Sequence, residues 1–141
     1  MLTQAQVTLV QETFAVIAPI ADDAAALFYR RLFELDPGLQ AMFKGDMSEQ
    51  RRKLMQMLTA AVKGLNHLDR LVPVVEDLGR RHAKYGVADA HYDTVGAALL
   101  WTLEKGLGSA FTPDAREAWA AVYGLLATTM KNAAARELVA A

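Results

Sequence analysis

The chain has no cysteine among its 141 residues. This absence excludes disulfides, zinc–thiolate sites, iron–sulfur clusters and thiol catalysis, because each of them needs a cysteine sulfur. An excess of charge of one sign is lacking too, since 15 basic residues stand against 16 acidic ones and the net charge is −1. A balanced charge argues against a nucleic acid or an anionic membrane as the partner.

Long apolar runs are also missing from the sequence. None approaches the ~18 residues that span a bilayer. The first residues, MLTQAQVTLVQETF, lack the basic start and the apolar stretch of a signal peptide. We therefore expect a cytoplasmic protein with no membrane partner. No segment alternates apolar and polar residues with a period of two, so no strand is predicted.

What the sequence does contain is helical periodicity. Hydrophobic residues make up 53% of the chain and recur at three- and four-residue steps, which predicts amphipathic helices around a core. Thr3 is expected to cap a first helix that ends near Pro19, and a second helix closes at the turn 36–38. Ser48 is expected to cap a third long helix.

The second half of the chain carries similar helix signals. After a break at residues 66–70, Pro73 is expected in the first turn of a helix that reaches about His82. A further helix ends near the glycines of 106–108, and Thr112, followed by proline and aspartate, marks the start of the last helix. The pattern predicts an all-α fold of six or seven helices in a single domain, residues 1–141.

Common catalytic motifs are absent from the sequence. It holds no GxSxG, no HExxH and no glycine-rich phosphate loop. Its three histidines are too scattered for a multidentate metal site. Taken alone, His82 and His91 are most simply read as surface or capping residues. A single histidine suffices, however, where a macrocycle supplies four other ligands of an iron, as haem does.

Three stretches together carry a family resemblance: LFYRRLFELDPGLQAMF (27–43), LGRRHAKYGVADAHYDTVG (78–96) and AWAAVYGLLA (118–127). With them the chain resembles the globins over essentially its whole length. It is most similar to the bacterial single-domain haemoglobins and to the haem domain of flavohaemoglobins. The resemblance implies a globin fold, with six to eight helices around a haem pocket, and haem b (iron protoporphyrin IX) as the cofactor.

The resemblance also implies roles for individual residues. His82 matches the proximal histidine that ligates the iron, and Tyr29 and Gln50 match distal positions that face the bound gas. Further positions match residues that line the cofactor: Phe43, Leu54, Leu78, Val87, Tyr92, Val95 and Tyr123. Lys53 and Arg81 are candidate partners of a haem propionate, although a solvated surface charge explains each of them as well. Three other aromatic residues are expected to be ordinary core: Phe28, Phe33 and Trp119.

One position departs from the flavohaemoglobin pattern. In that family a glutamate on the last helix completes a hydrogen-bonded set with the proximal histidine and the neighbouring tyrosine. The matching residue here is Ala134, and Glu137 lies three residues further on. Loss of that carboxylate should leave His82 less imidazolate-like, which favours stable ligand binding over peroxidase chemistry. It also leaves open what the Tyr92 hydroxyl bonds.

The resemblance therefore implies a haem protein that binds O2 reversibly, and also CO and NO, at a five-coordinate iron. NO dioxygenation is a linked activity, and we expect it to need an external reductase because a chain of this length has no room for flavin and nicotinamide domains. A haem-based gas or redox sensor is the alternative, although the sequence offers no distal histidine. A haem-free helical interaction module is a third class of function.

Overall fold

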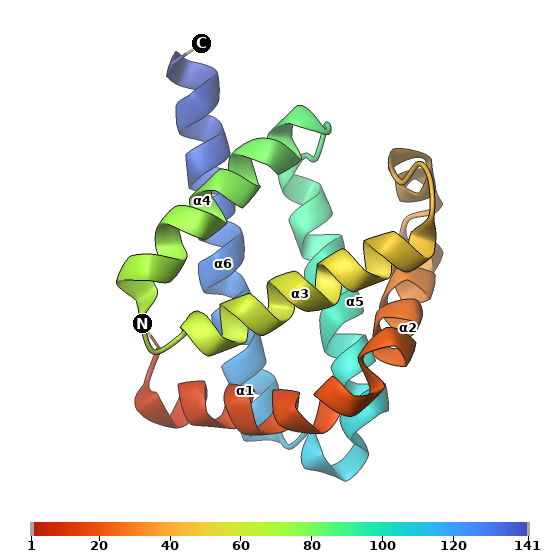
Figure 1. The fold of residues 1–141 in the computed structure, drawn as a ribbon, viewed down its shortest axis with the longest axis vertical. Coiled ribbons are helices and arrows are strands. Elements are labelled where there is room, and N and C mark those ends of the chain that lie inside the picture. Colours follow the sequence, from red (N-terminus) through yellow and green to blue (C-terminus); the bar gives the residue numbers. More distant parts are fainter. Residues whose placement is uncertain (1, 141) are drawn as a thin grey trace.

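The computed structural model describes the backbone of residues 2–140 and the side chains of residues 2–136. Within these residues the chain forms α-helices and short 3-10 helices and no strand, which confirms the all-α prediction (Figure 1). The elements are α1 (Gln4–Ile17), η1 (Ala18–Ile20), α2 (Ala21–Leu35), η2 (Pro37–Met42), α3 (Met47–Gly64), α4 (Leu68–Lys84), α5 (Asp89–Leu107), η3 (Gly108–Ala110) and α6 (Pro113–Ala140).

Several predicted helix ends are confirmed. The Thr3 hydroxyl accepts the N–H of Gln6 at 3.1 Å, which satisfies one free donor of the first turn of α1. Pro19 lies in η1, directly after α1 has ended. The Thr112 hydroxyl accepts the N–H of Ala115 at 3.1 Å at the start of α6. Capping side chains and prolines therefore set these boundaries as the sequence indicates.

Two predicted helix starts are wrong. Asp46, not Ser48, caps α3, because its carboxylate accepts the Ser48 N–H at 2.9 Å and so places Ser48 inside the first turn. Pro73 lies inside α4, which begins at Leu68. A proline there removes the helical bond to the carbonyl of Asp69. Both of these residues are exposed, so water can satisfy that carbonyl.

The helices pack in pairs around a shared core. α4 packs chiefly against α6, α2 against α5, and α1 against α6. α3 packs mainly on α2 and runs across the view in front of α5 (Figure 1). The largest fully buried side chains are Trp119, Leu32, Val10 and Val75. None of the helices within residues 2–140 is long and apolar enough to cross a bilayer.

Replacing Thr13 with valine should destabilise the fold. The buried Trp119 indole N–H donates to the Thr13 hydroxyl at 2.8 Å, joining α6 to α1. Valine fills the same space but leaves that donor unpaired, which costs about 1–3 kcal/mol. Chemical denaturation measures the loss, and Thr13→Ser, which keeps the hydroxyl, is the control. Equal stability of Thr13→Val and the parent protein would contradict the role of this bond.

Candidate functional site

His82 lies in the last turn of α4 with its ring half-buried. Its Nδ1 stands 2.8 Å from the carbonyl oxygen of Leu78, and because a carbonyl only accepts, Nδ1 is the protonated nitrogen. Burial lowers the pKa of His82; the hydrogen bond to Leu78 raises it to a smaller extent, and Arg81 lowers it slightly further. The side chain is therefore a neutral imidazole whose Nε2 carries a free lone pair, the form that binds a metal.

Tyr29 and Gln50 come together although they lie on different helices. The Gln50 amide nitrogen donates to the Tyr29 hydroxyl oxygen at 3.3 Å. Tyr29 is only 6% exposed. Burial raises its pKa, and the bond from Gln50 acts in the opposite direction to a smaller extent. The phenol therefore stays protonated, and since its oxygen is the acceptor from Gln50, its own proton is available to a further acceptor.

An aromatic cluster surrounds this pair. The ring centroid of Phe43 lies 5.4 Å from that of Tyr29 and 5.5 Å from that of Phe33. Phe28 and Trp119 are buried, as predicted for core residues. Phe33 was expected to be core as well, but it is only partly buried and packs on Phe43.

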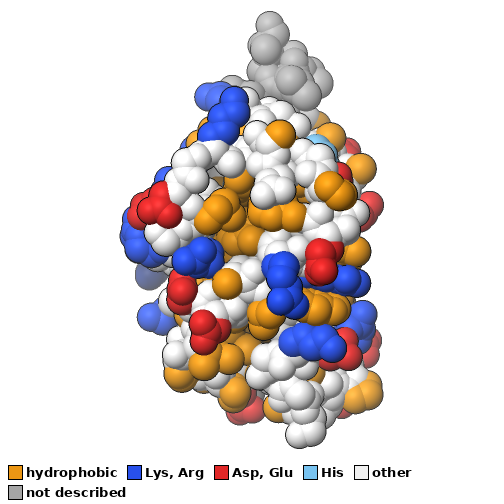
Figure 2. All heavy atoms as spheres, turned by 90° about the vertical axis from the view of Figure 1, so that its right-hand side faces the viewer, with side chains coloured by type: hydrophobic (Ala, Val, Ile, Leu, Met, Phe, Trp, Pro, Cys, Tyr) orange, Lys and Arg blue, Asp and Glu red, His pale blue; other side chains and the backbone are white. Residues whose placement is uncertain are grey.

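The other predicted apolar lining residues share one property. Each is partly buried and packs against the buried core: Leu54, Leu78, Val87 and Val95. Val87 also connects the loop after α4 to His82, because the Val87 N–H donates to the His82 backbone carbonyl at 3.1 Å. Figure 2 shows apolar side chains gathered near the middle of one face, between charged ones. A partly open apolar surface of this kind is typical of a ligand-binding groove.

The two candidate propionate partners lie at the surface. Lys53 and Arg81 are both exposed. The Arg81 guanidinium already pairs with a carboxylate oxygen of Asp77 at 3.1 Å, one helical turn earlier on α4. Lys53 forms no ion pair within the described side chains. The assignment of either residue to a propionate stays a prediction, and the existing ion pair makes Lys53 the better candidate.

Tyr92 contacts α6 through its backbone and its ring. The Tyr123 hydroxyl donates to the backbone carbonyl of Tyr92 at 2.6 Å, and the Lys131 ammonium lies 5.8 Å from the Tyr92 ring centroid. Among the side chains of residues 2–136, none accepts or donates a bond at the Tyr92 hydroxyl. Ala134 is partly buried, and Glu137 lies outside the described side chains. α6 therefore places a cation over the Tyr92 ring, and the described side chains give its hydroxyl no partner.

The second histidine of this region has a different role. The His91 Nδ1 accepts the N–H of Ala88 at 2.9 Å, at the start of α5. This bond satisfies one of the free donors of a helix start. The expectation that His91 is a surface or capping residue is confirmed.

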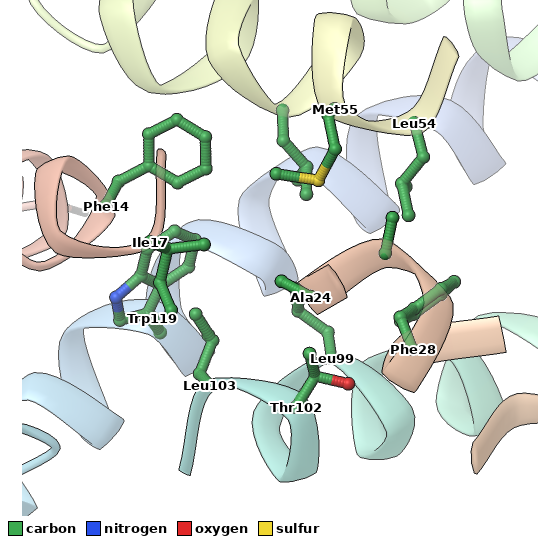
Figure 3. Close-up of a pocket in the computed structure, with 12 residues that line it drawn as sticks. Phe14, Ile17, Ala24, Phe28, Leu54, Met55, Leu99, Thr102, Leu103 and Trp119 are labelled. Carbon is green, nitrogen blue, oxygen red and sulfur yellow. The ribbon is translucent and has the colours of Figure 1, made fainter. Parts of the chain in front are cut away.

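A separate cavity of about 20 Å3 lies deeper in the core. Figure 3 shows apolar side chains converging on it from α1, α2, α3, α5 and α6, among them Phe14, Phe28 and Leu54. Leu54 lies one helical turn after Gln50. Neither His82, Tyr29 nor Gln50 lines this cavity, so it is not the candidate site itself. Because its lining is apolar, we expect it to hold no ordered water.

The comparisons with known proteins agree with this geometry. A sequence model of the Globin family matches residues 26–130. The chain belongs to the globin family. This globin is 31% identical to the flavohemoprotein of Bacillus subtilis over 130 residues, which cover 90% of the chain. It is 32% identical to the flavohemoprotein of Chromobacterium violaceum over 133 residues, or 92% of the chain. The globin spans about a third of the length of these curated relatives.

The donor set of the globin suits a haem. Its described side chains contain no group of three or more histidine, cysteine or acidic residues that could bind a metal ion alone. His82 instead offers one neutral nitrogen, which is enough when a porphyrin supplies four others. The partly buried apolar residues match the apolar faces of such a macrocycle. The residues present therefore fit the cofactor that the resemblance implies.

Sequence reasoning missed one functional group, the carbonyl of Leu78. It orients His82 by accepting the Nδ1 proton. The spacing of four residues on a helix is a signal that could have found it, because the carbonyl of the fourth residue before lies near a side chain one turn later. The resemblance drew attention only to the side chain of Leu78.

Proposed function

We propose that this globin holds haem b through His82 and binds O2 reversibly beside Tyr29 and Gln50. When bound, haem would supply an iron that can take a diatomic ligand, with His82 as its protein ligand. The hydrogen bond from Gln50 to the Tyr29 oxygen carries the proposal, because it leaves the phenol proton free for a gas ligand. CO and NO would occupy the same place.

Tyr29 provides most of the stabilisation in this proposal. Its phenol proton would be donated to a bound diatomic ligand that carries partial negative charge. One such bond in a poorly hydrated pocket contributes about 1–3 kcal/mol. Gln50 acts first on Tyr29, since its amide donates to the phenol oxygen and holds it in place. Slow release of O2 follows from this arrangement.

The proximal side supports ligand binding over peroxide chemistry. His82 donates its Nδ1 proton to a backbone carbonyl, which is a weaker acceptor than a carboxylate. The imidazole therefore keeps its proton and gives less electron density to the iron than an imidazolate does. Ala134, in place of a glutamate, is consistent with this state.

NO dioxygenation is the second candidate function. The two relatives are flavohemoproteins, a name for proteins that combine a flavin with a haem, and a flavin is a source of electrons. Conversion of NO and O2 to nitrate consumes one electron per turnover, so this globin would depend on an external reductase. The same phenol proton serves both functions.

An absorption spectrum of the purified protein tests the primary proposal. We expect a Soret band, a five-coordinate ferrous spectrum with dithionite, and a sharp shift on addition of CO. No Soret band after reconstitution with hemin would contradict haem binding altogether. A ferric spectrum with two strong nitrogen ligands would contradict the distal assignment of Gln50 and favour the sensor alternative.

A second measurement separates the two functions. The oxygenated protein is mixed with NO, with and without NADPH and a flavin-dependent ferredoxin reductase as the electron source. Sustained NO consumption with the reductase indicates dioxygenation. A single stoichiometric turnover under both conditions indicates a binding or scavenging role.

A further inference from the structure

α4 and α6 approach each other unusually closely at one residue. Gly79 is buried on α4. A Cβ atom added there would lie 2.4 Å from the backbone carbonyl oxygen of Met130 and 2.5 Å from its Cα. Both distances are far inside van der Waals contact, and the obstacle is backbone, which cannot rotate away. Only glycine therefore permits this depth of packing between the two helices.

The same peptide group orients His82. The carbonyl that accepts the His82 Nδ1 proton belongs to Leu78, and this carbonyl and the Gly79 nitrogen form one planar peptide unit. This peptide unit therefore lies against α6 at Gly79, and its carbonyl accepts the hydrogen bond that orients the imidazole. His82 follows Gly79 by three residues on the same helix, so any outward shift of α4 at Gly79 also moves the imidazole.

α6 also packs against α1 and α5. The Lys131 ammonium lies over the ring of Tyr92 on α5, 5.8 Å from its centroid. The adjoining residues Met130 and Lys131 thus contact α4 and α5 respectively. A side chain at Gly79 would therefore displace α4 with respect to both neighbours, and the helix that carries His82 would move alone.

We propose that Gly79 is a positioning residue for His82: its contact with Met130 sets how far the imidazole reaches toward the haem iron. The inference rests on the proposed ligation of haem by His82. Because α4 packs this closely on α6 at Gly79, His82 can bind the iron without strain along α4. Any larger residue at position 79 displaces the imidazole and weakens its bond to the iron.

The first test compares Gly79→Ala with Gly124→Ala. A Cβ at Gly124, on α6, meets no atom within 4 Å, so this control adds the same methyl group without a clash. In resonance Raman spectra of the ferrous proteins, we expect a lower iron–histidine stretching frequency for Gly79→Ala only. CO association should slow about tenfold in that variant, as misplacement of a reacting group does. Unchanged frequency and rate in folded Gly79→Ala would overturn the proposal.

The second test detaches the ligand from its helix. In His82→Gly supplied with free imidazole, the iron ligand no longer follows α4. Adding Gly79→Ala in this background should leave CO association unchanged. A rate that still falls about tenfold would show that Gly79 acts only on the general structure, and the positioning role would be wrong.

A third comparison does not depend on the folding of Gly79→Ala. His82→Gly with free imidazole keeps Gly79, and its iron–imidazole stretching frequency reports the strength of an iron–imidazole bond that is not linked to α4. We expect the tethered bond of the parent protein to be equally strong or stronger, because α4 sits deep. A markedly lower frequency in the parent protein would contradict binding without strain along α4. Absence of any iron–histidine band in the parent protein would instead contradict the proposed function.

Discussion

Replacement of His82 by alanine should abolish stable haem binding. The variant lacks the one neutral imidazole nitrogen that the site offers to a metal, and within the described side chains no other metal-binding cluster can replace it. Apolar contacts with a porphyrin remain, so weak association persists without an iron–protein bond. Gel filtration of the hemin-reconstituted protein, followed by the ratio of Soret to protein absorbance, measures the loss.

His91→Ala is the matched control for this prediction. It removes the same type of side chain nine residues away, where the ring accepts the Ala88 N–H at 2.9 Å. Loss of a helix cap costs about 0.5–2 kcal/mol of stability. The spectrum and the haem content should be those of the parent protein. Equal haem loss in both variants would mean that the effect is general destabilisation and not loss of the iron ligand.

The helices could be predicted from the sequence because their causes are local. Apolar spacing, the Thr3 cap and the stop at Pro19 act within one or two turns, and each was confirmed. The predicted start of α3 was wrong by two residues, since Asp46 and Ser48 are both capping types and the sequence alone does not decide between them. The prediction that Pro73 lies in the first turn of α4 was wrong, because an exposed proline can be accommodated within a helix as well as in its first turn.

The candidate site could be predicted only in part. The resemblance supplied the residue types, and the roles of His82, Tyr29 and Gln50 stay predictions that the geometry supports. The direction of the bond from Gln50 to Tyr29 could not be predicted, because the two residues lie 21 positions apart and meet only through the packing of α3 on α2. The contact between Gly79 and Met130 was missed for the same reason.

Tyr29→Phe should speed the release of O2 by roughly ten- to hundredfold. The substitution keeps the buried ring in its aromatic cluster and removes the phenol proton that Tyr29 offers to a ligand. Loss of a hydrogen bond worth about 1–3 kcal/mol gives a rate change of this size. Stopped-flow displacement of O2 by CO measures the rate. The control is Tyr85→Phe, which removes a phenol that is 70% exposed and should leave the rate unchanged.

Gln50→Leu decides how the distal pair works. If Gln50 acts by holding the Tyr29 oxygen, as their 3.3 Å bond indicates, its removal speeds O2 release in the parent protein but has little effect in Tyr29→Phe. The double-mutant cycle then shows a coupling energy within the range of about 0.5–3 kcal/mol for residues in contact. Strictly additive effects would mean that Gln50 reaches the ligand by itself. In that case the two donors act independently, and the Tyr29 phenol would donate its proton to the ligand without help from the Gln50 amide.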